Sequence, residues 1–312
     1  MLSRVAHNLY WFSRYLRRAE NMARLVDVSS QLQLDLPRAA RIAWRPLVDT
    51  LGANAEFERL HGSGGELGEA EVIHFLLVEP ENPLALRGVV RNAREILRTV
   101  RETLPQDCWV AINDLYLHIE ATAERAGSRR YRQDFLTRVI DSCLRVSALL
   151  SSNVSRDIGY QFLRLGSAIE QADMTSRIID AAAAGLIQPR SEDDVDAFRA
   201  MQWMSVLQSL AAYQMYRRHL RQRVSVELAL QFLLKDREFP RSVLFCVTRI
   251  QGILPQMPAQ RSVQQAFRRA LGLVFDADPA RLAVVGPCAF MDQLQVELAA
   301  LHAAIQESYF PD

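Results

Sequence analysis

A stretch near the N-terminus of this 312-residue chain returns, in altered form, half a chain later. Residues 10–28 read YWFSRYLRRAENMARLVDV, and residues 162–181 read FLRLGSAIEQADMTSRIIDA. With Ala19 aligned on Ala172, apolar residues fall on apolar residues, and the matched polar pairs are Glu20 with Asp173, Arg24 with Arg177 and Asp27 with Asp180. An internal repeat constrains the chain strongly, because both copies must fold in the same way.

Two further pairs of segments follow in the same order. FLLVEPENP at residues 75–83 returns as FLLKDREFP at residues 232–240, and between the first and last pairs Trp44 corresponds to Trp203. The three offsets are 153 residues (19 to 172), 159 (44 to 203) and 157 (75 to 232), so they differ only by a few residues of loop length. We therefore predict a tandem duplication, with a first helical repeat at residues 1–150 and a second at residues 151–312.

The spacing of apolar residues is helical throughout the chain. Val5, Leu9, Phe12, Leu16, Ala19, Ala23 and Val26 step by threes and fours, which predicts one apolar face of a long helix. Alternation typical of strands does not persist anywhere, and we expect the run at residues 71–78 to be helical. Asn82-Pro83 and Phe239-Pro240 predict helix starts, since Pro favours the first helical position. The predicted fold is all-α: an internally duplicated helical bundle whose two pseudo-symmetric halves pack as one body.

Composition narrows the function classes. The net charge of +1 argues against nucleic acid as the main partner, because phosphate backbones usually require a clearly basic face. The four cysteines form no Cys-x-x-Cys pair, and the six histidines lack metal-ligand spacing, so we expect no metal site. We found neither a secretory leader nor an apolar run of 18 residues, and we therefore expect a cytoplasmic protein that does not enter the membrane.

Charged residues form matching rows beside the apolar faces of the two long helices. The rows are Arg17, Glu20, Arg24 and Asp27 in the first copy, and Glu170, Asp173, Arg177 and Asp180 in the second. Such a row can be a solvated face with weak i,i+4 pairs, or a contact between the helices that carries a function. Arg17 aligns with Glu170, which has the opposite charge. We therefore predict that these two side chains pair across a pseudo-twofold axis.

The chain resembles the bacterial alpha-E family, all-helical proteins named for a Glu-Arg motif in a context such as RYLERAENTARLLDV. The similarity extends over almost the whole chain, through the blocks LQLDLPR, FLLVEPENP, SRDIGYQFLRLG, ADMTSRIID and EFPRSVLFC. Membership implies a bacterial cytoplasmic protein whose relatives are encoded beside, or fused to, a circularly permuted ATP-grasp ligase and a transglutaminase-like cysteine protease. It implies a role in amide or peptide biosynthesis, with ATP and Mg bound by the partner ligase and no cofactor bound directly.

The motif itself is incomplete in both copies. The Glu of the first Glu-Arg pair is Arg17 here, followed by the expected Arg18. In the second copy Glu170 is present, but Gln171 replaces the Arg, and Ser167 stands where the family pattern has Arg. An activity that needs an intact Glu-Arg pair on one helix is therefore in doubt.

Three functions are compatible with these residues. In the first, the chain is an accessory subunit of an ATP-grasp ligase that binds a carboxylate, an acyl-phosphate or the ligase itself; the candidate binding residues are Arg14, Arg18, Asn21, Arg24 and Arg177. In the second, it is an enzyme with a carboxylate as general base; the candidates are Glu20, Glu170 and Asp173. In the third, the polar rows only fix the pairing of the helices in a scaffold. The sequence leaves the three open, and we favour the first.

Overall fold

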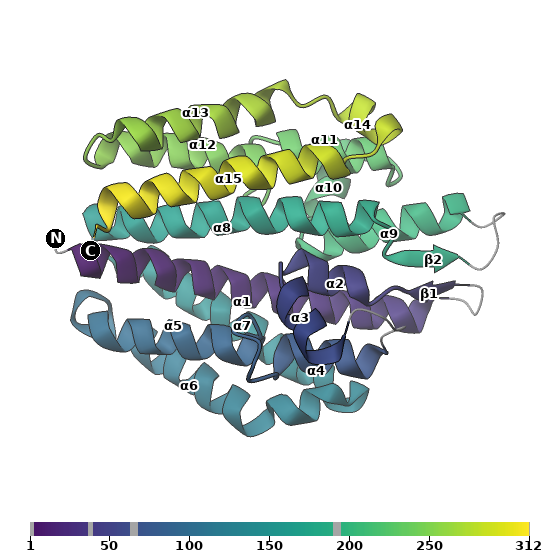
Figure 1. Cartoon of the computed structure of the whole chain (residues 1–312), viewed down its shortest axis with the longest axis horizontal. Coiled ribbons are helices and arrows are strands. Elements are labelled where there is room, and N and C mark those ends of the chain that lie inside the picture. The colour runs from purple at the N-terminus through teal and green to yellow at the C-terminus, as the bar shows by residue number, and fades with distance from the viewer. Residues whose placement is uncertain (1–2, 37–39, 63–67, 190–194, 312) are drawn as a thin grey trace.

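The computed structural model describes residues 3–36, 40–62, 68–189 and 195–311, and this part of the chain is almost entirely helical (Figure 1). The first half contains α1 (Ser3–Asp35), β1 (Ala40–Ile42), α2 (Arg45–Thr50), α3 (Asn54–His61), α4 (Glu69–Leu77), α5 (Leu86–Val100), η1 (Arg101–Thr103), α6 (Gln106–Thr122), η2 (Ala123–Gly127) and α7 (Arg129–Asn153). The second half contains α8 (Ile158–Ala183), β2 (Ile187–Pro189), α9 (Val195–Ser209), α10 (Tyr213–Leu220), α11 (Val226–Lys235), α12 (Val243–Ile253), η4 (Leu254–Gln256), α13 (Arg261–Asp276), α14 (Pro279–Val285) and α15 (Cys288–Tyr309). The all-α prediction is confirmed.

Two short strands accompany the helices and were missed in the sequence analysis. β1 and β2 pair antiparallel, with Ala40 opposite Pro189 and Ile42 opposite Ile187. Each strand has three residues, which is too short for an alternating pattern to stand out in the sequence. The two strands each follow one of the long helices, so the pairing joins corresponding places in the two halves.

The two predicted helix starts at proline are also wrong. α5 begins at Leu86, and the buried Asn82 forms a turn before it: its Nδ2 donates to the Phe75 carbonyl at 2.9 Å, and its Oδ1 accepts from the Leu84 amide at 3.0 Å. α12 begins at Val243 and is capped by Ser242, whose Oγ accepts from a backbone amide of the first turn. In both places Pro lies in the turn before the helix, where its fixed φ is equally well accommodated.

The helices form two groups that meet along α1 and α8. In Figure 1, α1, α5, α6 and α7 lie below and α8, α12, α13 and α15 lie above, with both chain termini at the same end of the molecule. The most extensive contact between any two elements is that of α1 with α8. Phe12 of α1 and Ile169 of α8 belong to one continuous buried core, and truncating a buried Phe of this kind to Ala typically costs about 3–5 kcal/mol.

The halves also exchange contacts away from this pair. α2, from the first half, packs on α8, and α9, from the second half, packs on α1. With the β1–β2 pairing, these contacts make the halves interdependent rather than two bodies that touch at one face. The order of elements is similar in the two halves, as a duplication would require; the common origin of the halves stays a prediction.

Candidate functional site

The polar rows predicted from the sequence lie where α1 and α8 meet. The helices run in the same direction, since Tyr10 is close to Gly166 and Arg14 is close to Glu170. At Gly166 the backbones come so near that an added Cβ would lie 2.3 Å from the Tyr10 carbonyl oxygen and 2.4 Å from the Ser13 Oγ. We call the polar contacts between α1, α8 and the start of α12 the seam. It is internal to the protein and not a solvated face.

Glu170, which is fully buried, is held by two arginines of the other helix. Arg14 Nε donates to Glu170 Oε2 at 2.7 Å, and Arg18 donates through Nε to Oε1 at 2.5 Å and through Nη2 to Oε2 at 3.1 Å. Burial alone would raise the pKa of Glu170, but the charges and hydrogen bonds of Arg18 and Arg14 lower it to about 2. Glu170 is therefore an anion at neutral pH.

Arg14 is surrounded by aromatic rings on its other side. Its guanidinium carbon lies 5.0 Å from the centroid of the Trp11 ring and 5.8 Å from that of Tyr10, distances typical of cation–π contacts. The Tyr10 hydroxyl is 2.8 Å from His302 Nδ1 of α15. Burial, and then the charge of Arg14, lower the pKa of His302 to about 4, so this ring is neutral at pH 7. Within the described residues, Nη1 of Arg14 is buried without a hydrogen-bond partner.

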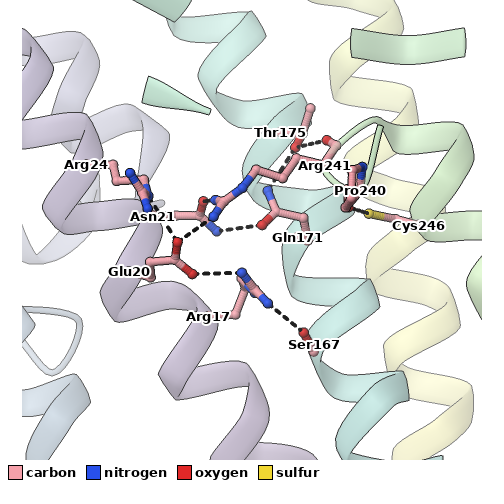
Figure 2. A network of polar contacts seen from close by, with 10 residues as sticks. All are labelled: Arg17, Glu20, Asn21, Arg24, Ser167, Gln171, Thr175, Pro240, Arg241 and Cys246. Carbon is pink, nitrogen blue, oxygen red and sulfur yellow. Dashed lines mark hydrogen bonds and ion pairs between the residues drawn. The ribbon is translucent and has the colours of Figure 1, made fainter. Parts of the chain in front are cut away.

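Glu20 is the second buried carboxylate of the seam, and three arginines surround it (Figure 2). Arg17 Nη1 donates to its Oε2 at 2.7 Å, Arg24 Nε donates to its Oε1 at 3.0 Å, and Arg241 also donates to Oε1. Burial opposes ionisation of Glu20, but the charges of Arg17, Arg241 and Arg24 and the hydrogen bond from Arg241 lower its pKa to about 2. Arg17 and Arg24 come from the same helix as Glu20, whereas Arg241 precedes α12.

A line of amide and hydroxyl groups continues from this cluster into the second half. Arg241 Nη1 donates to Asn21 Oδ1 at 3.1 Å, and Asn21 Nδ2 donates to Gln171 Oε1 at 3.4 Å. Gln171 Nε2 donates to Thr175 Oγ1 at 3.1 Å, and the Thr175 hydroxyl donates to the Arg241 carbonyl at 2.9 Å. Figure 2 shows that these side chains close a ring between α1, α8 and the segment before α12. Gln171, which replaces an Arg of the family motif, is a member of this ring.

The structure does not form the cross-pair predicted between Arg17 and Glu170. Glu170 pairs with Arg14 and Arg18, which are four residues apart and therefore share one face of α1. Arg17 is one position before Arg18, so it lies on the neighbouring face, where its Nη2 contacts Ser167 Oγ at 3.4 Å. Arg17, Glu20, Arg24 and Glu170 of the predicted rows lie at the seam, but the predicted pairing of Arg17 with Glu170 was wrong. Asp27 contacts Gln31 of its own helix, and Asp180 faces Cys288 of α15.

The contacts Arg14–Glu170 and Arg17–Ser167 are reciprocal under the offset of 153 residues. Residue 14 corresponds to 167 (14 + 153), and residue 17 corresponds to 170 (17 + 153). Exchanging the two copies therefore turns the Arg14–Glu170 contact into the Arg17–Ser167 contact. Reciprocal contacts are those expected between two units related by a twofold axis. The predicted pseudo-symmetry would give this arrangement, and the duplication itself stays a prediction.

The remaining predicted residues lie farther along the same helices. Arg177 Nε donates to Asp173 Oδ2 at 2.9 Å within α8, and both side chains are partly exposed. Of the candidate bases, Glu20 and Glu170 are saturated by guanidinium groups, while Asp173 has only this partner among the described residues. Of the candidate binding residues, Arg14, Arg18 and Asn21 are committed to internal contacts, and Arg24 and Arg177 each reach a carboxylate of their own helix.

Sequence reasoning missed Arg241, Tyr10 and His302. Arg241 lies in the block EFPRSVLFC, which was noted only for its similarity to the family. Its guanidinium connects Glu20 with Asn21, more than 200 residues earlier in the chain, and no periodicity in the sequence predicts such a contact. Burial lowers the pKa of Arg241, and the charge of Glu20 acts against this.

The described residues contain no cluster of three or more His, Cys, Asp or Glu side chains arranged to hold a metal ion. In the part of the chain that the structure covers, no helix combines the length and the apolar character needed to cross a membrane.

Comparisons with known proteins give one family model and several relatives. The Alpha-E family model, described as "A predicted alpha-helical domain with a conserved ER motif", matches residues 1–310. The chain is 22% identical over 324 residues to "Uncharacterized protein Mb2597" of Mycobacterium bovis and to "Uncharacterized protein Rv2567" of Mycobacterium tuberculosis. Each alignment covers 97% of this chain but 36% of the relative, so the chain spans about a third of the length of these proteins. No solved structure matches the chain.

Proposed function

The chain belongs to the Alpha-E family, and from that premise we propose that it is a non-catalytic binding subunit of a bacterial system that forms amide or peptide bonds with ATP. In this proposal the partner is a circularly permuted ATP-grasp ligase, which binds ATP and Mg, and a transglutaminase-like protease can belong to the same system. The chain supplies a site for an anionic substrate or for the ligase.

The ion pairing of Glu20 and Glu170 carries this proposal. A general base at neutral pH is most effective when its pKa lies near 7, because it must both be free of its proton and accept one readily. Glu20 and Glu170 have pKa values of about 2 and are enclosed by arginines that occupy their oxygens. Such carboxylates stabilise the positions of cations, and they are poor acceptors for a substrate proton.

The length of the relatives supports a partner. In the two mycobacterial proteins about two thirds of the chain lies outside the region that corresponds to this one. A domain that is joined to further chain in its relatives commonly works with that further part, whether fused or separate. The resemblance to the alpha-E family supplies the identity we propose for the partner.

Within this proposal the candidate binding residues divide into two groups. Arg14 and Arg18 hold Glu170 and keep the two halves in register. Arg24 and Arg177 retain partial exposure of their side chains, at 19% and 27%, and can contact a carboxylate or the ligase from the edge of the seam. Arginine suits this role because its planar guanidinium binds carboxylates and phosphates through two parallel hydrogen bonds.

The proposal is tested by purifying the chain together with a circularly permuted ATP-grasp ligase from the same organism. We expect the two to co-elute in size-exclusion chromatography and the chain to raise ligase turnover, measured as ADP release. Arg24→Gln and Arg177→Gln should weaken the complex or raise the KM for the acid substrate without changing the melting temperature by more than about 2 °C. Separate elution together with unchanged ligase turnover would refute the proposal.

The same assay distinguishes a non-catalytic binding subunit from a chain that is itself the enzyme. If the chain itself supplies the base, Asp173→Asn should abolish product formation while the complex with the ligase remains intact. If the chain is only a binding subunit, Asp173→Asn should leave the rate within about threefold of wild type at saturating substrate.

A further inference from the structure

A groove on the second half of the molecule is lined by arginines that the seam does not use. It has a volume of about 730 Å³ and lies where the first turns of α8 meet α12 and η4. A smaller pocket of about 90 Å³, between α1, α7 and α8, shares three lining residues with it, namely Tyr160, Arg164 and Arg249. We call the two together the arginine groove.

The lining of the arginine groove is strongly cationic. Its arginines are Arg17, Arg156, Arg164, Arg237 and Arg249, and neither lining set contains an Asp or a Glu. The remaining polar lining consists of hydroxyl and amide side chains, including Ser147, Ser151 and Gln256. This concentration of one charge stands out in a chain whose net charge is only +1.

Arg249 lies at the centre of the groove without a carboxylate partner among the described residues. Burial lowers its pKa, and the charges of Arg164 and Arg17 lower it further. Arg14 is buried and Arg18 is partly buried, but Glu170 reverses the effect of burial there and raises the pKa of both. A desolvated cation beside other cations costs free energy, and an anion bound in the groove would offset that cost.

Of the neighbouring arginines, Arg17 pairs with Glu20, whereas Arg164 and Arg156 are held in place by uncharged groups. Arg164 Nη1 donates to Gln161 Oε1 at 3.1 Å, and the guanidinium carbon of Arg156 lies 4.0 Å from the centroid of the Tyr160 ring. These contacts orient the guanidinium groups but leave their charge uncompensated. Three acids adjoin groove residues in the sequence, and none of them lines the groove: Asp157, Asp236 and Glu238. Asp157 caps α8 by accepting from the Tyr160 amide, and Asp236 accepts from the Glu238 and Phe239 amides.

We propose that the arginine groove is a binding site for a small polyanion that carries two or more phosphate or carboxylate groups. A volume of 730 Å³ is within the usual range for small-molecule sites. Several fixed guanidinium groups can each engage an anionic group through paired hydrogen bonds, while single phosphates would leave most of them unused. Arg164 and Arg249 provide the primary contacts, and Arg156, stacked on Tyr160, forms the outer edge.

This inference deepens the proposed function and rests on it, since it gives the binding subunit a ligand class. The two proposals can fail separately. Binding to the arginine groove is measured on the isolated chain, whereas the subunit role is measured as a complex with the ligase.

The test is calorimetric titration of the full chain with inorganic tripolyphosphate and, separately, with citrate, at about 50 mM salt. We expect one molecule of at least one probe to bind per chain, with an affinity that falls steeply as salt is added. If only tripolyphosphate binds, the ligand is phosphorylated. If only citrate binds, the ligand is a polycarboxylate. Arg249→Gln and Arg164→Gln should each weaken binding at least tenfold.

Arg138→Gln is the matched control, because it removes one exposed positive charge from α7 outside the groove. It should change the Kd by less than twofold. Arg249→Gln should also melt at or above the wild-type temperature without ligand, since it removes like-charge repulsion, and it should lose the increase that the probe gives to wild type. Equal weakening by Arg138→Gln and Arg249→Gln, or no binding of either probe, would overturn the inference. Loss of the ligase complex in Arg249→Gln without binding of either probe would assign the groove to the partner protein instead.

Discussion

Replacing Glu170 by Gln tests whether the seam holds the two halves together. Gln has the same shape but no charge, so the buried Arg14 and the partly buried Arg18 would remain in place without an anion. Removing one partner from a buried ion pair typically costs about 3–5 kcal/mol. With an unfolding entropy of about 2.1 cal/mol/K per residue, a loss of that size lowers the melting temperature of the 312-residue chain by roughly 5–8 °C.

The pKa of Glu170 gives a second estimate of the same quantity. Its pKa falls from 4.5 to about 2 on folding, and each pKa unit corresponds to about 1.4 kcal/mol, so the ionised form contributes about 3 kcal/mol. Because the folded pKa is the lower one, this stability is complete above the unfolded pKa near 4.5 and is lost as the pH falls towards 2. The difference between wild type and Glu170→Gln should therefore be about 3 kcal/mol at pH 7 and should shrink progressively between pH 5 and pH 2.

Urea unfolding followed by far-ultraviolet circular dichroism at several pH values measures this difference. Glu95→Gln is the control, because Glu95 has the same charge and pairs with Arg98 at 2.9 Å on an exposed surface. Its effect should stay within about 0.5 kcal/mol. A loss below about 1 kcal/mol for Glu170→Gln, or a difference that does not change between pH 5 and pH 2, would refute the assignment of a paired, buried anion.

Three other predictions concern the seam and the thiols. Gly166→Ala should lower the free energy of unfolding by about 1–3 kcal/mol in urea, since its Cβ would overlap the Tyr10 carbonyl and push α1 and α8 apart. Arg17→Glu and Ser167→Arg should each destabilise the protein alone, but together should regain at least about 1 kcal/mol in a double-mutant cycle, because a new cross-pair forms where the two residues already touch. With an aromatic disulfide reagent at pH 8, native protein should react slowly at the partly exposed Cys288, whose pKa is raised to about 11 by burial and by Asp180, and its other three cysteines should react only on unfolding.

Each of these predictions has an internal control. Gly272→Ala, in α13, adds a Cβ that meets no atom within 4 Å and should stabilise the helix by up to about 1 kcal/mol. A similar gain for Gly166→Ala would mean that the helices are not in close contact there. Strict additivity in the double-mutant cycle would show that residues 17 and 167 do not interact. Rapid reaction of all four cysteines in native protein would contradict their burial.

The sequence predicted the helical class and the location of the seam because both depend on local patterns. A row such as Glu20, Arg24 and Asp27 lies on one helix face wherever that helix is placed, and its return in the second copy indicated that the face has a partner. The partners themselves depend on the rotation of α1 against α8. A turn of one residue, about 100°, separates Arg17 from Arg18, and this turn decides which of them reaches Glu170.

Contacts that join distant segments could not be predicted in this way. Arg241 reaches Glu20 only because α12 packs on α8, and the Tyr10–His302 contact requires α15 to return beside α1. The β1–β2 pairing was missed for a different reason. Each strand has only three residues, which is too few for an alternation of apolar and polar residues to be recognised. Long-range packing, which no single segment encodes, fixed these features.

Two of the three departures from the family motif lie in one place. Arg17 stands where the motif has Glu, Ser167 stands where it has Arg, and both line the small pocket beside Arg249. The contact between positions 17 and 167 corresponds to that of Arg14 with Glu170 under the repeat offset. With Glu at position 17 and Arg at position 167 it would be a second ion pair between α1 and α8, and Arg249 would have a carboxylate nearby. The two changes together replace that internal ion pair by an open, cationic pocket. Arg17→Glu also removes a partner of Glu20, so we expect the Arg17→Glu, Ser167→Arg double variant to be more stable than Arg17→Glu alone. It should bind tripolyphosphate or citrate at least tenfold more weakly than wild type, since it places an internal anion where the proposed ligand would bind.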